Sequence, residues 1–217
     1  RCSRDWSSDV CSSDLMVDEW GTWWDVEKGT NPGFLFQQNA LRDAMTAGMN
    51  LNIFNNNAAR VKMANIAQTV NVLQAIVLTK DEKIVLTPTY YVFKMYKVHQ
   101  DANMIPVTLS GIPVYNKYNE KLPLINASAS VNNKGDINIT LCNIDAQNGQ
   151  QVEIELDDNY GGKIEGEIIT GEKITSFNDF GKTEEVNIKP FSGFKQNGKT
   201  ITLNMPSKSI VKITIVK

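Results

Sequence analysis

The sequence predicts an α/β plus all-β fold, in which the C-terminal part of a (β/α)8 barrel is followed by an antiparallel, jelly-roll-like β-sandwich. Up to about residue 100, strand-like and helix-like segments alternate, which is the order typical of α/β proteins. After Pro106, short segments rich in Val, Ile, Thr and Asn are separated by turn residues at short intervals, which is typical of a sandwich or jelly roll. We therefore assign residues 16–104 to the barrel and residues 105–217 to the sandwich.

Residues 1–15 fit neither part. Residues 5–15, DWSSDVCSSDL, match the translation of a sequencing-library adaptor in one reading frame. The segment also lacks the hydrophobic core of a signal peptide and any helical or strand period. We interpret residues 1–15 as an artefactual leader, and we expect the natural protein to continue upstream of Met16.

The next segment, residues 16–24 (MVDEWGTWW), delivers one carboxylate, Glu19, into a cluster of tryptophans. In a strand, successive side chains alternate between faces, so Glu19 shares a side with Val17 and Trp20 lies on the other. Flat rings can stack on a sugar while a carboxylate attacks or stabilises its anomeric carbon. The alternative is an ordinary strand end with solvated acids and tryptophans in the core.

Two further barrel elements follow a loop at residues 25–33 that contains Gly, Asn and Pro. Apolar residues at three-to-four spacing predict a helix over residues 34–55. Residues 63–71 fit helix or strand by periodicity, and the alternating order of a barrel favours its last strand. Asn71 would then face the barrel mouth, although a turn residue at the strand end is the preferred interpretation.

Pro88 predicts the start of the final barrel helix. Its aromatic residues recur at helical spacing and are expected in the core: Tyr90, Tyr91, Phe93 and Tyr96. His99 follows at the C-terminal end of this helix, where a cation suits the helix dipole. We therefore expect His99 to be structural.

The sandwich part contains about eight short, turn-bounded segments that predict strands: residues 105–109, 122–131, 136–144, 151–157, 163–170, 184–191, 199–205 and 209–216. Ile137, Ile139 and Leu141 alternate with polar neighbours and are expected to point inward. The aromatic residues of this part are scattered along the chain. We therefore expect a structural domain packed on the barrel rather than a separate carbohydrate-binding platform.

Composition argues against several kinds of site. Without the leader, Cys142 is the single cysteine, and His99 is the single histidine, so we expect no disulfide, no metal site and no cofactor. The net charge of −2 and the absence of Lys/Arg clusters argue against nucleic-acid binding. No apolar run reaches the ~18 residues of a membrane helix. A lone cysteine fits a reducing compartment, so a cytoplasmic location is favoured.

Three long blocks then resemble the end of the catalytic domain of α-L-arabinofuranosidases of glycoside hydrolase family 51. They are DEWGTWW, QQNALRDAMTAGMNLNIFNNNAARVKMANIAQTVNVLQAIVLT and LTPTYYVFKMYKVHQDA. The resemblance covers residues 17–102 almost continuously, and that family has a β-sandwich after the barrel. It implies that Glu19, on barrel strand 7, is the catalytic nucleophile and that Trp23 lines the sugar pocket.

The activity implied by this resemblance is retaining hydrolysis that removes terminal non-reducing α-L-arabinofuranosyl residues from arabinose-containing oligosaccharides or polysaccharides. The family's acid/base is the glutamate of an Asn-Glu pair at the end of barrel strand 4. The pair at residues 119–120 lies in the linker to the sandwich and does not match. We therefore expect the 217-residue chain alone to be inactive and poorly folded, because a partial barrel exposes apolar edges.

Two other hypotheses stay open at this stage. One is a different retaining glycosidase of the same barrel clan, such as an endoglucanase or xylosidase. The other is a non-catalytic carbohydrate-binding or structural sandwich attached to a decayed barrel. The oligomeric state of the parent enzyme is also open, with a homo-oligomer as one option.

Overall fold

The computed structural model describes residues 14–117, 120–157 and 162–217. Most of the expected leader, residues 1–13, therefore lies outside the described residues, as does Asn119 of the Asn-Glu pair. Leu15, the last residue of that leader, is the first residue of strand β1. The leader and the domain boundaries stay predictions.

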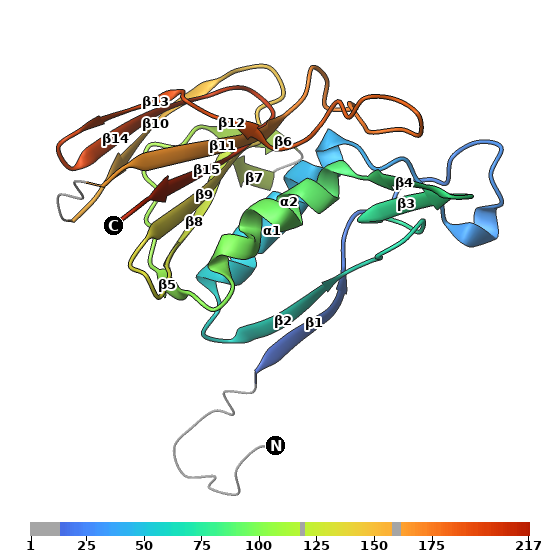
Figure 1. Ribbon diagram of the computed structural model, residues 1–217, viewed down its shortest axis with the longest axis horizontal. Helices are drawn as coiled ribbons and strands as arrows, with labels where there is room; N and C mark the ends of the chain where they lie inside the picture. Colours follow the sequence, from blue (N-terminus) through green and yellow to red (C-terminus); the bar gives the residue numbers. More distant parts are fainter. Residues whose placement is uncertain (1–13, 118–119, 158–161) are drawn as a thin grey trace, which may run out of the picture.

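The barrel part begins with a β-α-β unit (Figure 1). Strand β1 (Leu15–Trp20) and strand β2 (Val61–Ile66) pair in parallel, and helix α1 (Leu41–Asn56) connects them. A parallel pair needs such a crossover, because a tight turn joins only antiparallel strands. This unit is what the alternating pattern of the sequence predicts for the end of a barrel.

Helix α1 begins later than the predicted helix over residues 34–55. A 3-10 turn, η1 (Pro32–Phe34), comes first, and Leu35 then has a φ of 49°, in the left-handed region. The Asp43 carboxylate accepts a hydrogen bond from the backbone N–H of Ala40 at 2.8 Å. That contact satisfies a donor which an isolated helix start leaves open, so the helix begins at Leu41.

Strand β2 is also shorter than the predicted strand over residues 63–71. Beyond it, Asn71 has a φ of 59° and forms two hydrogen bonds with Thr79, one from the Asn71 side-chain amide at 2.9 Å and one from the Thr79 backbone at 2.7 Å. Asn71 is therefore a turn residue, as preferred from the sequence. A hairpin that the sequence analysis did not predict follows, made of β3 (Val77–Lys80) and β4 (Lys83–Leu86).

Helix α2 (Pro88–Tyr96) begins at Pro88, as predicted. The Thr87 hydroxyl accepts a hydrogen bond from the Tyr90 backbone at 3.4 Å and so caps the helix start. A 3-10 turn, η2 (Lys97–His99), continues the chain toward the sandwich.

The sandwich consists of a six-stranded and a three-stranded antiparallel sheet. The six-stranded sheet has the order β12-β11-β15-β9-β8-β5, and its strands are β5 (Asn103–Ile105), β8 (Ile125–Val131), β9 (Ile137–Asn143), β11 (Ile164–Thr170), β12 (Lys189–Pro190) and β15 (Ser209–Ile215). The second sheet has the order β10-β14-β13, with β10 (Gln150–Glu155), β13 (Phe194–Asn197) and β14 (Thr200–Met205). A separate hairpin joins β6 (Val114–Lys117) to β7 (Glu120–Pro123).

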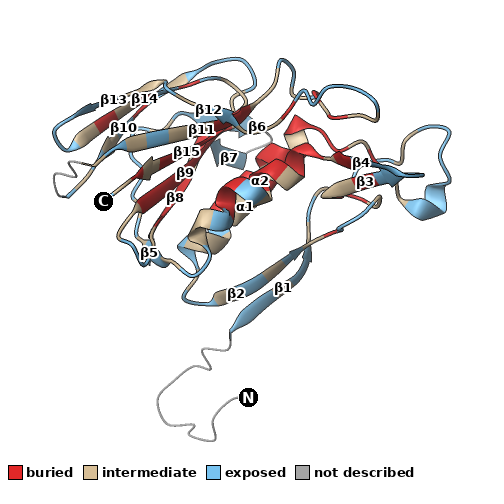
Figure 2. Ribbon diagram, in the orientation of Figure 1, coloured by how far each residue is buried: buried red, intermediate tan, exposed pale blue. Residues whose placement is uncertain are grey.

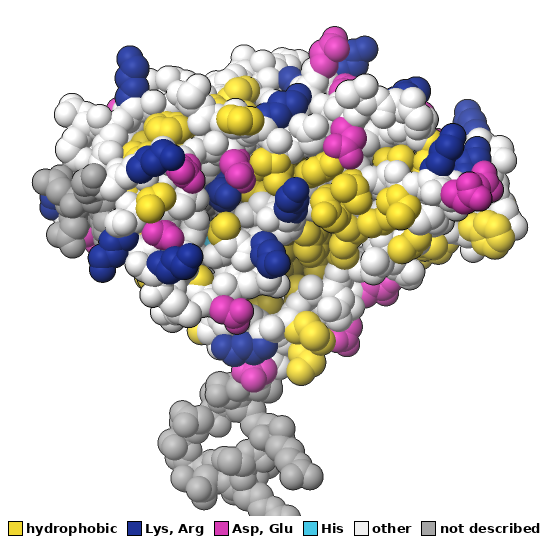
Figure 3. All heavy atoms as spheres, in the orientation of Figure 1, with side chains coloured by type: hydrophobic (Ala, Val, Ile, Leu, Met, Phe, Trp, Pro, Cys, Tyr) yellow, Lys and Arg dark blue, Asp and Glu magenta, His cyan; other side chains and the backbone are white. Residues whose placement is uncertain are grey.

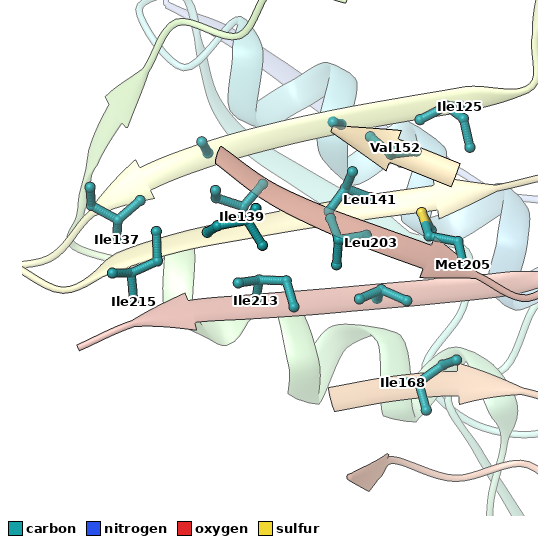
Figure 4. Packing of buried hydrophobic residues seen from close by; sticks show 14 residues of the cluster. Ile125, Ile137, Ile139, Leu141, Val152, Ile168, Leu203, Met205, Ile213 and Ile215 are labelled. Atoms are coloured by element: carbon teal, nitrogen blue, oxygen red, sulfur yellow. The ribbon is translucent and has the colours of Figure 1, made fainter. Parts of the chain in front are cut away.

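The main hydrophobic core lies between these two sheets (Figure 4). Ile137, Ile139 and Leu141 of β9 point into it, as predicted, and meet residues such as Leu203 and Met205 of β14. Burial of such side chains contributes about 25 cal/mol for each Å² of apolar surface removed from water.

The other face of the six-stranded sheet is covered by α1 and α2 (Figures 1 and 2). All seven residues of β9 are buried, because the polar side of the strand packs against helices instead of facing solvent. The helix approaches the sheet closely at Gly48 of α1, where a Cβ atom would stand 2.8 Å from the Cys142 sulfur. Glycine at this position therefore lets the helix lie directly on the sheet.

Two of the predicted sandwich strands form only in part. Ile105 is the only residue of the segment 105–109 that lies in a strand, β5. In the segment 184–191, only Lys189 and Pro190 lie in a strand, β12. The long connection at residues 171–188 instead packs on the barrel part, where the Asn178 side chain donates to the Leu86 carbonyl at 2.9 Å. The Asn178 side chain also donates to the Val186 carbonyl at 2.8 Å and accepts from the Val186 backbone at 2.9 Å, so this connection is held by side-chain hydrogen bonds as well.

Apolar side chains remain exposed along the barrel part. Leu15 and Met16 on β1 and Met63 on β2 are 44–57% exposed, and a closed barrel would cover such strands on both sides. On the face drawn in Figure 3, hydrophobic side chains gather in the middle, over the region of α2 in Figure 1. Charges of both signs surround this area.

Candidate active site

Glu19 is the last residue but one of β1, so it lies at the C-terminal end of a parallel strand. Its side chain is exposed, whereas Trp20 packs between the two helices. The Trp20 ring centroid lies 5.3 Å from that of Phe54 on α1 and 6.0 Å from that of Phe93 on α2. The alternation expected from the sequence thus separates Glu19 from Trp20.

A cavity of about 220 Å³ lies at this end of the parallel pair. The residues that line it come from the end of β1 and from the segment after β2: Glu19, Trp20, Gly21, Thr22, Trp23, Ala67 and Leu73. The structure therefore brings Glu19 and Trp23, the two residues selected from the sequence, to one cavity. Glu19 is the single carboxylate among the described lining residues.

The three neighbouring tryptophans have different surroundings. Trp23 is 69% exposed and lines the cavity. Trp24 is held from two sides, because its indole N–H donates to Asp43 at 2.8 Å and the Arg42 guanidinium lies 4.5 Å from its ring centroid. Trp20 belongs to the layer between strand and helices. Trp23 is therefore the most exposed of these three rings.

The turn that carries Trp23 rests on a buried carboxylate. Asp43, on the first turn of α1, is fully buried and accepts hydrogen bonds from the Thr22 hydroxyl at 2.5 Å and from the Trp24 indole at 2.8 Å. Its second oxygen accepts from Ala40, and the Arg42 Nε atom lies 3.6 Å away. A buried charge needs such partners to be stable.

Two buried glutamines complete the support of this turn. The Gln74 side chain accepts from the Thr22 backbone at 2.7 Å and donates to the Asp43 backbone carbonyl at 2.7 Å. The Gln37 side chain accepts from the Trp24 backbone at 2.8 Å. Such networks are rigid when every member is satisfied.

Asp43, Gln37 and Gln74 were not among the site residues predicted from the sequence. A signal was present, because Asp43 stands among apolar residues on the buried side of the helical pattern, where a charge is rare. Periodicity alone does not say which partner such a residue meets.

Gly21 fits this site for a conformational reason. Its φ is +149°, and a Cβ atom there would stand 3.1 Å from the Gln74 side-chain oxygen and 3.3 Å from the Ala67 carbonyl. Residues with a side chain rarely adopt this conformation. The chain can therefore turn from β1 into the Thr22–Trp24 segment only with glycine at this point.

His99 does not belong to this cavity. It has a structural role, as expected, but through contacts beneath the helices and not as a cation at the helix end. Its ring nitrogens lie 2.7 Å from the Ser130 hydroxyl and 3.0 Å from the Thr140 hydroxyl, beneath the helices. Burial, together with the nearby Lys212 charge, lowers the pKa of His99 from 6.5 to about 4. His99 is therefore neutral near pH 7 and joins the barrel part to the sandwich.

Cys142 is buried beside the Tyr96 hydroxyl at 3.4 Å, and burial raises the pKa of its thiol to about 12. Among the described residues, no group of three or more His, Cys, Asp or Glu side chains is arranged to hold a metal ion. No helix in the described part of the chain is long and apolar enough to cross a membrane.

Comparison with known proteins identifies the family. The model of the α-L-arabinofuranosidase C-terminal domain matches residues 18–209. The chain belongs to this family. It is 49% identical over 201 residues to an intracellular exo-α-L-arabinofuranosidase of Bacteroides ovatus, covering 93% of the chain and 39% of that protein. It is 28% identical over 177 residues to α-L-arabinofuranosidase C of Emericella nidulans, covering 78% of the chain and 34% of that protein.

Solved structures confirm the fold class of this α-L-arabinofuranosidase C-terminal domain. The crystal structure of a GH51 arabinofuranosidase from Xanthomonas axonopodis pv. citri superposes with a TM-score of 0.89 at 43% identity, covering 93% of the chain and 41% of that protein. An α-L-arabinofuranosidase from Thermotoga maritima, solved with arabinose, gives a TM-score of 0.79 at 19% identity, covering 94% of the chain and 43% of that protein. The chain thus spans about two fifths of the length of these relatives.

Proposed function

We propose that the whole protein is a retaining glycoside hydrolase that removes terminal non-reducing α-L-arabinofuranosyl residues from arabinose-containing oligosaccharides or polysaccharides. The observation that carries the proposal is the cavity in which Glu19 lies beside the exposed Trp23 ring. It is supported by 49% identity to an exo-α-L-arabinofuranosidase. That relative is named as intracellular, so we propose the same location for this protein.

In the proposed reaction, one Glu19 oxygen attacks the anomeric carbon of the arabinofuranosyl unit. The bond from that carbon to the glycosidic oxygen breaks, and a second carboxylic acid gives its proton to the departing oxygen. Water then attacks the covalent glycosyl-enzyme, and the same second group removes the proton from this water. Two inversions give net retention of configuration.

The second carboxylic acid is proposed to lie in the part of the whole protein that these residues do not include. Retaining pairs stand about 5 Å apart, and no carboxylate other than Glu19 lines the cavity among the described residues. The 217-residue chain alone is therefore expected to release no arabinose.

The test is hydrolysis of p-nitrophenyl α-L-arabinofuranoside by the full-length protein and its Glu19→Gln variant. An amide cannot serve as the nucleophile, so we expect kcat to fall by at least about a thousandfold. Asp18→Asn is the matched control, because Asp18 is an exposed carboxylate one residue earlier in the same strand. A Glu19→Gln enzyme with nearly wild-type turnover would remove Glu19 from the nucleophile role.

Two further measurements separate the rival activities. Parallel assays with p-nitrophenyl β-D-xyloside and β-D-glucoside test the other glycosidases of the clan, and faster release from either would contradict the proposed substrate. Proton NMR of the first product shows its anomeric configuration. An inverted product would exclude a covalent intermediate on Glu19.

A further inference from the structure

We propose that Asp43 is a positioning residue that holds the Thr22–Trp24 segment, and with it the Trp23 ring that lines the cavity, at the place where a sugar stacks. The proposal rests on the proposed function, because it assigns Asp43 an effect on substrate binding. Asp43 does not line the cavity itself. It would act through Thr22 and Trp24, on either side of Trp23 in the chain.

Two hydrogen bonds of the Asp43 carboxylate go to this segment, and a third satisfies the start of α1. One oxygen accepts from the Thr22 hydroxyl at 2.5 Å and from the Trp24 indole at 2.8 Å. The other oxygen accepts from the Ala40 backbone at 2.8 Å. A carboxylate offers acceptor sites only, whereas an amide would turn an N–H donor toward one of these donors. Asparagine at residue 43 therefore cannot satisfy all three.

Trp23 depends on these neighbours because its own ring is 69% exposed. The residues before and after it are both bound to Asp43, so the backbone of Trp23 is held on both sides. Trp24 is further confined by the Arg42 guanidinium, 4.5 Å from its ring centroid. Release of the Thr22 and Trp24 side chains from Asp43 would leave this segment held by the Gln74 and Gln37 hydrogen bonds to its backbone, and the Trp23 ring could then shift relative to Glu19.

The first turn of α1, on which Asp43 stands, is itself held by the sandwich. The backbone N–H of Leu41 donates to the Ser176 carbonyl at 2.8 Å, and that of Arg42 donates to the Ile174 carbonyl at 2.9 Å. Both carbonyls lie in the connection at residues 171–188 between β11 and β12. Asp43 is thus fixed in space by the sandwich domain, and the wall of the cavity is fixed by Asp43.

Loss of this support should raise KM more than it lowers kcat. A ring stacked on the sugar contributes about equally to the bound substrate and to the transition state, and removal of such uniform binding appears in KM. Displacement of a binding group by about 1 Å can lower the catalytic efficiency of an enzyme by up to about a hundredfold. For Asp43→Asn we therefore expect a rise in KM of about tenfold to a hundredfold, with kcat changed less than about threefold.

The experiment compares the full-length wild type with Asp43→Asn, Thr22→Val and Thr22→Ser, assayed on p-nitrophenyl α-L-arabinofuranoside well below each unfolding midpoint. Valine keeps the shape of threonine but removes the hydroxyl donor, whereas serine keeps that donor. We expect Thr22→Val to raise KM in the same direction as Asp43→Asn, and Thr22→Ser to recover most of the lost affinity. Asp101→Asn, an exposed carboxylate after η2, is the matched control.

Crystal structures of the wild type and of Asp43→Asn give a second test that does not need activity. We expect the Thr22–Trp24 segment to shift or to lose order in the variant. Superposition of this segment on the wild type, or a lower unfolding midpoint with unchanged KM, would overturn the proposal and leave Asp43 as a purely structural residue. A wild type without arabinofuranosidase activity would refute the proposed function instead, and the two crystal structures would still decide the positioning role.

Discussion

Acidification should weaken the contact between the barrel part and the sandwich through the protonation of His99. The ring lies against Ser130 and Thr140 with its pKa lowered to about 4, first by burial and then by the Lys212 charge. In the unfolded chain the same ring has a pKa of about 6.5. Between pH 4 and pH 6.5 the unfolded state therefore binds a proton that the folded state does not.

The sign and size of the effect follow from this difference. Where the unfolded state binds more protons, the free energy of unfolding rises with pH, by about 1.4 kcal/mol for each pH unit and each proton. The contribution of neutral His99 is therefore complete above pH 6.5 and is lost as the pH falls toward 4. The difference between the pKa of 6.5 in the unfolded chain and the pKa of about 4 in the folded protein corresponds to about 3 kcal/mol of free energy of unfolding.

The assay is chemical denaturation of the full-length protein and of its His99→Gln variant at a series of pH values from 4 to 7.5. Glutamine does not titrate, so the difference between the two proteins isolates His99 from all carboxylates. At pH 7.5 the variant should be less stable, because it loses the packing of the ring. The stability gap should narrow by about 3 kcal/mol as the pH falls to 4. A gap that stays constant with pH would show that His99 titrates normally in the folded state and would refute the reasoning.

Two other substitutions test the local geometry. Gly21→Ala should lower both stability, by about 1–3 kcal/mol, and kcat/KM, because the backbone at φ +149° is strained for alanine; unchanged kinetics and unfolding midpoint would contradict this. Asn178→Ala should lower the free energy of unfolding by about 1–3 kcal/mol. The substitution removes a buried side chain that donates to the Leu86 and Val186 carbonyls and accepts from the Val186 backbone N–H. The exposed Asn133→Ala should change this free energy by less than about 0.5 kcal/mol, and an equal loss in both variants would contradict the role of Asn178.

Much of the sandwich could be predicted from the sequence, because its strands carry a strict period of two. Alternation in β9 correctly assigned Ile137, Ile139 and Leu141 to the core between the sheets. The same alternation could not reveal what covers the other face. Asn138 and Thr140 look like solvent-facing residues, yet they are 2% and 0% exposed, and the Thr140 hydroxyl donates to Asn52 on α1.

Glu19 could be placed at a strand end from the sequence, since a strand and its alternation are local properties, whereas Trp23 is indicated only by the resemblance of DEWGTWW to family 51. The start of α1 could not be predicted from periodicity, because the backbone N–H of Leu41 donates to the carbonyl of Ser176, far away in the chain. The supports of the site are also distant from one another in sequence. Asp43 meets Thr22 across 21 positions and Gln74 meets Thr22 across 52. The periodicity of a sequence indicates neither the partner nor the burial of a polar side chain. These supporting residues could therefore be found only from the three-dimensional structure.

The contact between α1 and the sandwich bears on whether the sandwich could act as a module separate from the barrel. Asn52 on α1 is fully buried, and its side-chain oxygen accepts from the hydroxyls of Ser128 and Thr140 at 2.8 Å each. Separation of the two parts would leave these groups without partners, and each unsatisfied buried group costs about 1–3 kcal/mol unless water replaces its partner. It would also expose the apolar cluster in which Leu41 and Met95 meet residues of the sheet. A sandwich that worked alone would be expected to present a polar outer face here, so the interface favours barrel and sandwich as one cooperative unit.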